Sequence, residues 1–224
     1  MADPRNGKPE PSRQQGPHQG AAVVEFGVPL AGAGAAVILL HGRGATAENI
    51  LGLAEQFGRQ DLAIRAPQAA GNSWYPYSFL APLDQNEPGL SSALRLIEHL
   101  LGDIARQGTP PEKTVLAGFS QGACLALEFA TRNPRRYGAV IALSGGVIGP
   151  PGTTWNALGS LEFTPVFLGS GDLDSHIPLE RVHETTELLR RLGAEVTERI
   201  YPGMGHGINE DEMVMVRQLL NSIG

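Results

Sequence analysis

The sequence has a single cysteine, Cys124, among its 224 residues. One cysteine cannot form a disulfide within the chain, so the sequence excludes the disulfide-stapled folds typical of small secreted proteins. Cys124 lies in the apolar stretch GACLALEFA, where a free cysteine usually behaves as a small buried hydrophobic residue rather than as a reactive thiol. This cysteine content fits a reducing compartment, and we predict a cytoplasmic protein.

Long apolar runs and clusters of basic residues are also missing. No run approaches the roughly 20 apolar residues that cross a bilayer, and the first 20 residues lack the apolar segment of a secretory signal. Lys and Arg number 17 against 23 Asp and Glu, which gives a net charge of -6. Nucleic acids and anionic membranes favour basic patches. We therefore expect no nucleic-acid partner and no stable insertion into a membrane.

The distribution of apolar residues predicts one domain that follows a short tail. Residues 1–20 are rich in proline, glycine, glutamine and charge, a composition that predicts a disordered tail. Apolar residues make up 42% of the chain, enough for a sizeable core, and we expect residues 21–224 to form a single domain. The chain lacks the histidine and carboxylate spacing typical of metal sites. We therefore expect no metal and no other cofactor.

From residue 21 on, short apolar runs alternate with segments of helical periodicity. The runs that we expect to form strands are 23–28, 35–40, 62–65, 114–119, 139–143, 166–168 and 196–201. The segments that we expect to form helices are 46–57, 90–106, 121–132, 179–192 and 209–222. This alternation predicts an α/β fold with a mostly parallel sheet. Such sheets place their functional sites at the carboxyl ends of the strands.

The segment 118–122 reads GFSQG and matches the pattern G-x-S-x-G. It lies between the expected strand TVLAGF and the expected helix QGACLALEFA, which is the setting of a nucleophile elbow, a sharp turn that exposes a serine hydroxyl. The alternative is a plain glycine-rich turn, because the pattern alone is weak in a chain with 29 glycines. The strand–turn–helix setting favours Ser120 as a nucleophile.

A serine nucleophile needs a base, and the base needs a group that orients it. His206 follows the last expected strand in the glycine-rich segment YPGMGHG, and a late histidine is typical of this chain order. The acid is expected between Ser120 and His206, directly after a strand. The segment GSGDLD offers Asp172 and Asp174, and the residues alone do not separate these two candidates.

Acyl transfer also needs backbone N–H groups that stabilise the negative oxygen of the transition state. The residue after the nucleophile usually supplies one, here Gln121, and the loop after an early strand supplies the other. That loop is HGRG, so we assign the N–H of Arg43. The sequence leaves two roles open for the Arg43 side chain. It could bind an anionic substrate, or it could be a solvated surface residue. We expect His41 to fix this loop rather than to take part in chemistry.

Four motifs in this order, VILLHGRGA, GFSQG, GDLDSHIP and GMGH, resemble the phospholipase/carboxylesterase family, which includes the acyl-protein thioesterases. The resemblance runs from about residue 35 to the end. It implies an α/β-hydrolase fold without a large lid domain and a triad of Ser120, His206 and Asp174, the second aspartate of G-D-x-D. It also implies that carboxylic esters or thioesters are hydrolysed. Ser170 and the aromatic segment 72–77 differ from the eukaryotic thioesterases, so the chain looks more like the bacterial esterase branch.

The span 71–89 is long and aromatic, and we expect it to wall an acyl pocket with Trp74 and Tyr75 as substrate-binding residues. The alternative is a surface loop that packs on the core. The interval 144–165 is too short for a lid domain, which favours short to medium acyl esters. An acyl-protein thioesterase, a lysophospholipase and a non-catalytic binding module are the alternative functions. The predicted partner is a small-molecule ester or thioester, with a homodimer as the candidate assembly.

Overall fold

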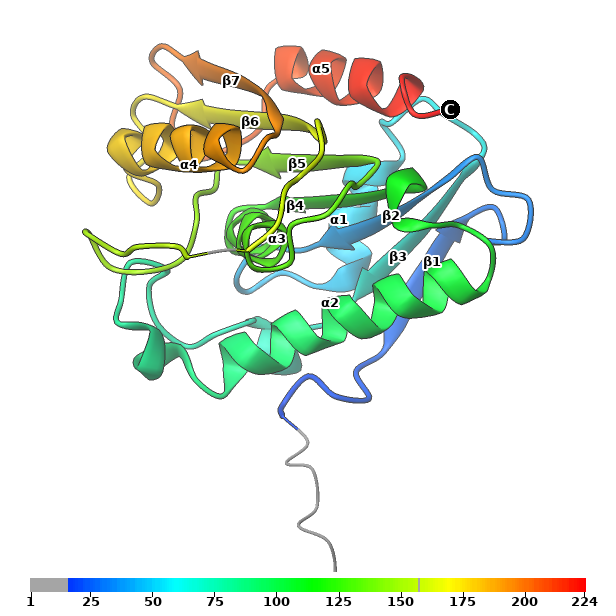
Figure 1. Cartoon of the computed structure of the whole chain (residues 1–224), viewed down its shortest axis with the longest axis horizontal. Coiled ribbons are helices and arrows are strands. Elements are labelled where there is room, and N and C mark those ends of the chain that lie inside the picture. Colours follow the sequence, from blue (N-terminus) through cyan, green and yellow to red (C-terminus); the bar gives the residue numbers. More distant parts are fainter. Residues whose placement is uncertain (1–15, 157) are drawn as a thin grey trace, which may run out of the picture.

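The structure is a computed structural model that describes residues 16–156 and 158–224. In this part of the chain seven strands form one sheet in the order β1-β3-β2-β4-β5-β6-β7 (Figure 1). Only β1 pairs antiparallel, with β3, and the other neighbouring strands are parallel. The strands are β1 (Val23–Gly27), β2 (Ala35–Leu40), β3 (Leu62–Pro67), β4 (Thr114–Phe119), β5 (Ala139–Leu143), β6 (Pro165–Gly171) and β7 (Glu195–Tyr201). The mostly parallel sheet predicted from the sequence is confirmed.

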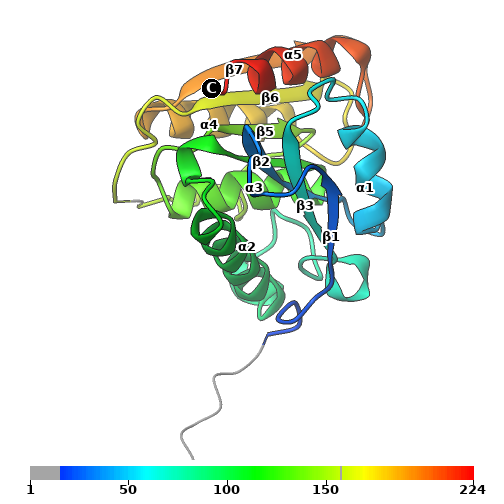
Figure 2. The same cartoon turned by 90° about the vertical axis from the view of Figure 1, so that its right-hand side faces the viewer.

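Helices cover both faces of the sheet (Figure 2). Residues of α2, α3 and α4 pack in one hydrophobic cluster, and residues of α1 and α5 pack in the other. The helices are α1 (Ala47–Ala54), α2 (Gly89–Arg106), α3 (Gln121–Arg132), α4 (Leu179–Arg191) and α5 (Glu210–Asn221). Among the described residues, no helix has both the length and the apolar character that a bilayer crossing requires.

The sequence of β2 is apolar throughout because both faces of the strand are buried. Alternate side chains of a strand point to opposite faces. Accordingly Ala36, Ile38 and Leu40 join the cluster under α2 and α3. Their neighbours Ala35, Val37 and Leu39 join the cluster under α1 and α5. All six residues are buried, as expected for a parallel strand that is covered on both faces.

Two helices begin at residues that cap them. Thr46 precedes α1 and Asn209 precedes α5, and each forms a capping box with the residue three positions later. The helix predicted over 46–57 ends sooner, at Ala54, because the chain turns toward Gly58, which has a φ of 70°. For α1 the start is therefore easier to recognise than the end, since the cap is a single polar residue.

The prediction of a disordered tail over residues 1–20 is wrong for residues 16–20. Residues 1–15 lie outside the described part of the chain, whereas residues 16–20 pack on the domain. His18 is 1% exposed, and its backbone N–H donates to Ser92 Oγ at 2.9 Å. Composition predicted disorder because this segment has few apolar residues, but it is held by hydrogen bonds of polar groups instead.

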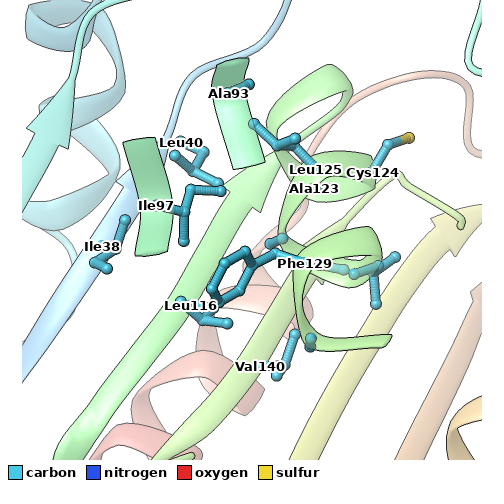
Figure 3. Close-up of a cluster of buried hydrophobic side chains, with 14 of the residues drawn as sticks. Ile38, Leu40, Ala93, Ile97, Leu116, Ala123, Cys124, Leu125, Phe129 and Val140 are labelled. Atoms are coloured by element: carbon cyan, nitrogen blue, oxygen red, sulfur yellow. The ribbon is translucent and has the colours of Figure 1, made fainter. Parts of the chain in front are cut away.

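The cluster below α3 is densely packed around aromatic and branched side chains (Figure 3). Phe129 of α3 is fully buried and shares this cluster with Leu116 of β4 and Val140 of β5. Since α3 starts directly after the elbow, this packing also fixes the position of that turn. Removing the ring leaves a cavity that the surrounding side chains cannot fill.

We predict that Phe129→Ala lowers the free energy of unfolding by about 3–5 kcal/mol, as measured by urea denaturation. The matched control is Phe163→Ala, because Phe163 is 69% exposed and its loss should change stability by about 0.5 kcal/mol or less. Equal effects of the two variants would contradict the packing described for α3.

Candidate active site

Ser120 occupies a sharp turn between β4 and α3, with φ 56° and ψ -120°. A non-glycine residue with positive φ is strained and needs support from the surrounding structure. Here its N–H donates to Leu143 O at 2.9 Å. A Cβ on Gly118 would lie 2.4 Å from the carbonyl carbon of Gly122, and one on Gly122 would lie 2.1 Å from Leu40 O. The two glycines of G-x-S-x-G are therefore needed for the close approach of α3 to the sheet.

The side chains of Ser120, His206 and Asp174 form a continuous chain of hydrogen bonds. His206 Nε2 lies 2.9 Å from Ser120 Oγ, and His206 Nδ1 lies 2.7 Å from Asp174 Oδ2. With its Nδ1–H donated to the carboxylate, the neutral imidazole keeps Nε2 free to accept the serine proton. The other carboxylate oxygen, Asp174 Oδ1, accepts the backbone N–H groups of His176 and Ile177 at 2.8 and 3.0 Å.

These contacts favour an ionised Asp174. Burial opposes the charge, but the hydrogen bonds from His206 and from the two backbone N–H groups outweigh it, and the pKa of the carboxyl is lowered. Asp172 is placed differently: its Oδ1 accepts the backbone N–H of Gly203 at 2.7 Å, and its side chain is exposed. Of the two aspartates that the residues left open, the structure brings Asp174 to the imidazole.

Two rings flank His206. The Phe119 ring lies 5.0 Å and the His176 ring 4.7 Å from the imidazole, measured between ring centroids. No role for His176 was expected from the sequence. Its position two residues after Asp174, which places both in the same turn, is the feature of the sequence that indicates its proximity to the site. Both rings restrict how far the imidazole of His206 can rotate.

The backbone N–H groups of Arg43 and Gln121 belong to residues that line the same cavity as Ser120. Arg43 follows β2, and Gln121 is the first residue of α3. The first N–H groups of a helix have no acceptor within the helix, and the helix dipole favours negative charge there. This edge of the sheet thus gathers the two N–H groups that the sequence analysis named.

The side chains of Arg43 and Gln121 bind the segment 73–77. Gln121 Oε1 accepts the Trp74 N–H at 3.0 Å, and Gln121 Nε2 donates to Tyr75 O at 2.9 Å. The Arg43 guanidinium donates to Ser73 Oγ, Pro76 O and Tyr77 O. Of the two roles considered for this side chain, exposure to solvent is the one observed, because Arg43 is exposed. Its guanidinium also holds the segment 73–77 through these three hydrogen bonds.

His41 fixes the loop after β2, as expected from the sequence. Its Nδ1–H donates to Gly42 O at 2.8 Å, and its Nε2 accepts the N–H of Ala69 at 3.1 Å. The imidazole is fully buried, and burial lowers its pKa. His41 is therefore a neutral bridge between two loops, and it is not among the residues that line the cavity beside Ser120.

A cavity of about 640 Å³ opens beside Ser120. Its walls include residues 75–79 of the aromatic span together with Phe119, Cys124, His176, Ile177 and His206. Tyr75 lines this cavity, and its role in substrate binding stays a prediction. Ile177 is a wall residue that the sequence analysis did not name, although it follows Asp174 by only three positions.

The prediction that Trp74 binds substrate is wrong. Trp74 is fully buried, and its indole Nε1–H donates to His41 O at 2.8 Å. The side chain points into the domain because that carbonyl satisfies its one polar atom. The aromatic character of the span correctly predicted a wall, but it could not tell which ring faces the cavity.

Cys124 is buried, as expected from its apolar helix. Burial raises the pKa of its thiol to about 12, so it is protonated at neutral pH and a weak nucleophile. Among residues 16–156 and 158–224, no three histidine, cysteine, aspartate or glutamate side chains gather in a way that could hold a metal ion. The residues brought together at this site are those of nucleophilic acyl chemistry.

Comparisons with known proteins show which family the chain resembles. A family model described as Phospholipase/Carboxylesterase matches residues 20–223. The crystal structure of a phospholipase/carboxylesterase from Dyadobacter fermentans is 45% identical, with a TM-score of 0.87, and the match covers 90% of this chain and 97% of that one.

Curated fungal proteins are more distant relatives. Acyl-protein thioesterase 1 of Saccharomyces cerevisiae is 28% identical over 201 residues, which cover 79% of this chain and 87% of the yeast protein. Acyl-protein thioesterase 1 of Gibberella zeae is 28% identical over 148 residues, and the match spans only 61% of this chain and 59% of the fungal protein. Since the family model extends over nearly the whole described domain, the chain belongs to the phospholipase/carboxylesterase family and is a hydrolase with the α/β-hydrolase fold.

Proposed function

We propose that the chain is a serine carboxylic-ester hydrolase that acts on short to medium acyl esters through an acyl-enzyme intermediate. The observation that carries this proposal is the unbroken hydrogen-bond chain from Ser120 through His206 to Asp174, which starts at a strained elbow. A serine hydroxyl without a base is a poor nucleophile. A strained turn that presents the hydroxyl to a histidine, which an ionised aspartate orients, supplies what the reaction needs.

In the first half of the reaction, Ser120 Oγ attacks the carbonyl carbon of the ester while His206 Nε2 takes the hydroxyl proton. Asp174 holds the Nδ1–H tautomer and stabilises the imidazolium that forms. The tetrahedral intermediate collapses, and the bond between the carbonyl carbon and the leaving oxygen breaks. His206 returns its proton to that oxygen, so an alcohol departs and an ester remains on Ser120.

In the second half, His206 takes a proton from water as the water oxygen attacks the acyl-enzyme. The bond to Ser120 Oγ breaks, Oγ regains the proton, and the carboxylic acid leaves. In both halves the negative oxygen accepts hydrogen bonds from the N–H groups of Arg43 and Gln121. Preorganised donors of this kind contribute about 3–4 kcal/mol each to stabilising the transition state.

The cavity wall supports an apolar acyl group. Tyr75, Phe79 and Ile177 line it, and no acidic side chain lies among its lining residues in the described part of the chain. The first residues after β5 are bound to the domain. The N–H of Ile148 in this segment donates to Glu128 Oε2 at 2.9 Å. An open site without a lid domain fits short to medium acyl chains better than triglycerides.

Two alternatives share the same chemistry. The fungal relatives are called acyl-protein thioesterases, so hydrolysis of thioesters is the second candidate, with lysophospholipid hydrolysis beside it. A binding module that lacks activity is a third candidate, but such a module has no need of a strained Ser120. The cytoplasmic compartment and the homodimer stay predictions from the sequence.

We predict that Ser120→Ala lowers kcat for p-nitrophenyl butyrate by several orders of magnitude, because the nucleophile is lost. Labelling by a fluorophosphonate probe should disappear in the same variant. Circular dichroism of the variant serves as the control for folding. Labelling equal to that of the unchanged protein would show that another nucleophile reacts.

The two aspartates provide a matched pair of variants. Asp174→Asn should lower kcat by about 10⁴-fold, as loss of the orienting carboxylate does in a serine protease, with little change in KM. Asp172→Asn should keep most of its turnover and lower stability by about 1 kcal/mol, since only the bond to the Gly203 N–H weakens. Steady-state kinetics and thermal melting distinguish the two, and the opposite ranking would refute the assigned acid.

Acyl-chain preference separates the proposed function from its alternatives. With p-nitrophenyl esters of two to sixteen carbons, we predict that kcat/KM peaks at short to medium chains, because an open site without a lid domain leaves a long chain partly in water. Matched thioesters give the ratio of thioester to ester hydrolysis. A rate that rises steadily to palmitoyl, or a preference for thioesters, would favour the lysophospholipase or thioesterase function instead.

A further inference from the structure

Two buried histidines accept consecutive backbone N–H groups where the chain leaves β3. Ala69 N–H donates to His41 Nε2 and Ala70 N–H donates to His18 Nδ1, both at 3.1 Å. Burial lowers the pKa of both imidazoles, and only a neutral imidazole has a nitrogen that can accept. The two histidines lie in different segments of the chain: His41 directly follows β2, and His18 precedes β1.

The same two rings enclose Trp74. The His18 and His41 ring centroids lie 5.5 and 4.9 Å from the indole. His18 Nε2–H donates to Trp74 O at 2.9 Å, and the indole N–H donates to His41 O at 2.8 Å. Trp74 is thus fixed on both sides and through both its backbone and its side chain.

His18 is itself anchored to the long helix α2. Its N–H donates to Ser92 Oγ, and Gln19 Nε2 donates to Ser92 O, both at 2.9 Å. A Cβ on Gly16 would lie 2.5 Å from the Ser92 Cβ, so the chain lies directly against the helix. This short N-terminal segment is therefore a rigid support for the His18 ring.

The segment that His18 holds is the one that contacts both proposed oxyanion residues. On its far side, Trp74 N–H and Tyr75 O bind the Gln121 side chain, and the Arg43 guanidinium binds residues 73, 76 and 77. In addition, Gly44 N–H donates to Asn72 O at 2.7 Å. A shift of residues 72–77 would therefore move the backbone on which both oxyanion N–H groups lie.

We propose that His18 is a positioning residue for the oxyanion site, acting through residues 72–77. The proposal rests on the proposed function. Oxyanion donors stabilise the transition state only when they are already in place, so a small displacement costs rate more than it costs binding of the ester. Without the His18 imidazole, Ala70 N–H and Trp74 O lose their partners and residues 72–77 are released on one side.

The test compares two histidine-to-alanine variants. His18→Ala should lower kcat by about ten- to a hundredfold with KM changed less than about twofold, assayed well below the melting temperature of the variant. The control is His183→Ala, since His183 is half-exposed on α4 and pairs with Glu198, and its kcat should equal that of the unchanged protein. If His18→Ala does not fold, His18→Phe carries the same expectation, because it fills the space and offers no hydrogen bond.

A double-mutant cycle with Gln121→Ala tests whether the effect travels through Trp74. That substitution removes the side chain that binds Trp74 and Tyr75 but keeps the backbone N–H. If both side chains hold the same segment, the loss of kcat in the double variant should be smaller than the product of the single losses. Independent, multiplicative losses would overturn the proposal, as would a His18→Ala variant that only melts earlier or only raises KM. If Ser120→Ala retains turnover, the proposed function fails as well, whereas an inactive Ser120→Ala beside a normal His18→Ala refutes this inference alone.

Discussion

The close approach of α3 to the carboxyl ends of β2 and β4 is the constraint on which the rest of the site depends. Gly122 packs against Leu40 O and Gly118 against Gly122, at distances that no Cβ would allow. The approach forces Ser120 into its strained conformation and places the first N–H of α3 beside the hydroxyl. The strain is maintained because α3 is anchored at its other end by the buried Phe129. In the function proposed here, activation of Ser120 is thus a consequence of helix packing.

Parallel strands bring the remaining parts to the same edge. Arg43 follows β2, Asp174 follows β6 and His206 follows β7, so residues far apart in sequence meet without long loops. Asp174 Oδ1 accepts hydrogen bonds from two N–H groups of its own turn. These bonds fix the carboxylate in the orientation in which Oδ2 contacts the imidazole. The order of the sheet and the local turn after β6 together set the geometry of the triad.

Properties encoded in short stretches were predictable from the sequence, whereas those that depend on a distant polar partner were not. The strands and Ser120 follow from local periodicity and from one turn motif. Asp174 and Asp172 could be separated only by resemblance, because the difference is which of them faces His206. The orientation of Trp74 depends on a carbonyl at residue 41, and the packing of His18 depends on partners at residues 70, 74 and 92. Neither partner set leaves a trace in the composition of the segment itself.

The hydrogen bonds that tie residues 73–77 to Arg43 and Gln121 have a consequence for how the enzyme can diverge. Residues 75–77 line the proposed acyl pocket, and the segment 73–77 holds the two proposed oxyanion residues. A substitution that changes the shape of the pocket there is therefore expected to change turnover as well. Phe79 and Ile177 line the same cavity but have no side-chain polar atoms through which to join that network. In the proposed function, a change of acyl-chain preference through the side chains of Phe79 and Ile177 therefore leaves the hydrogen bonds of residues 73–77 in place, whereas a change within 73–77 does not.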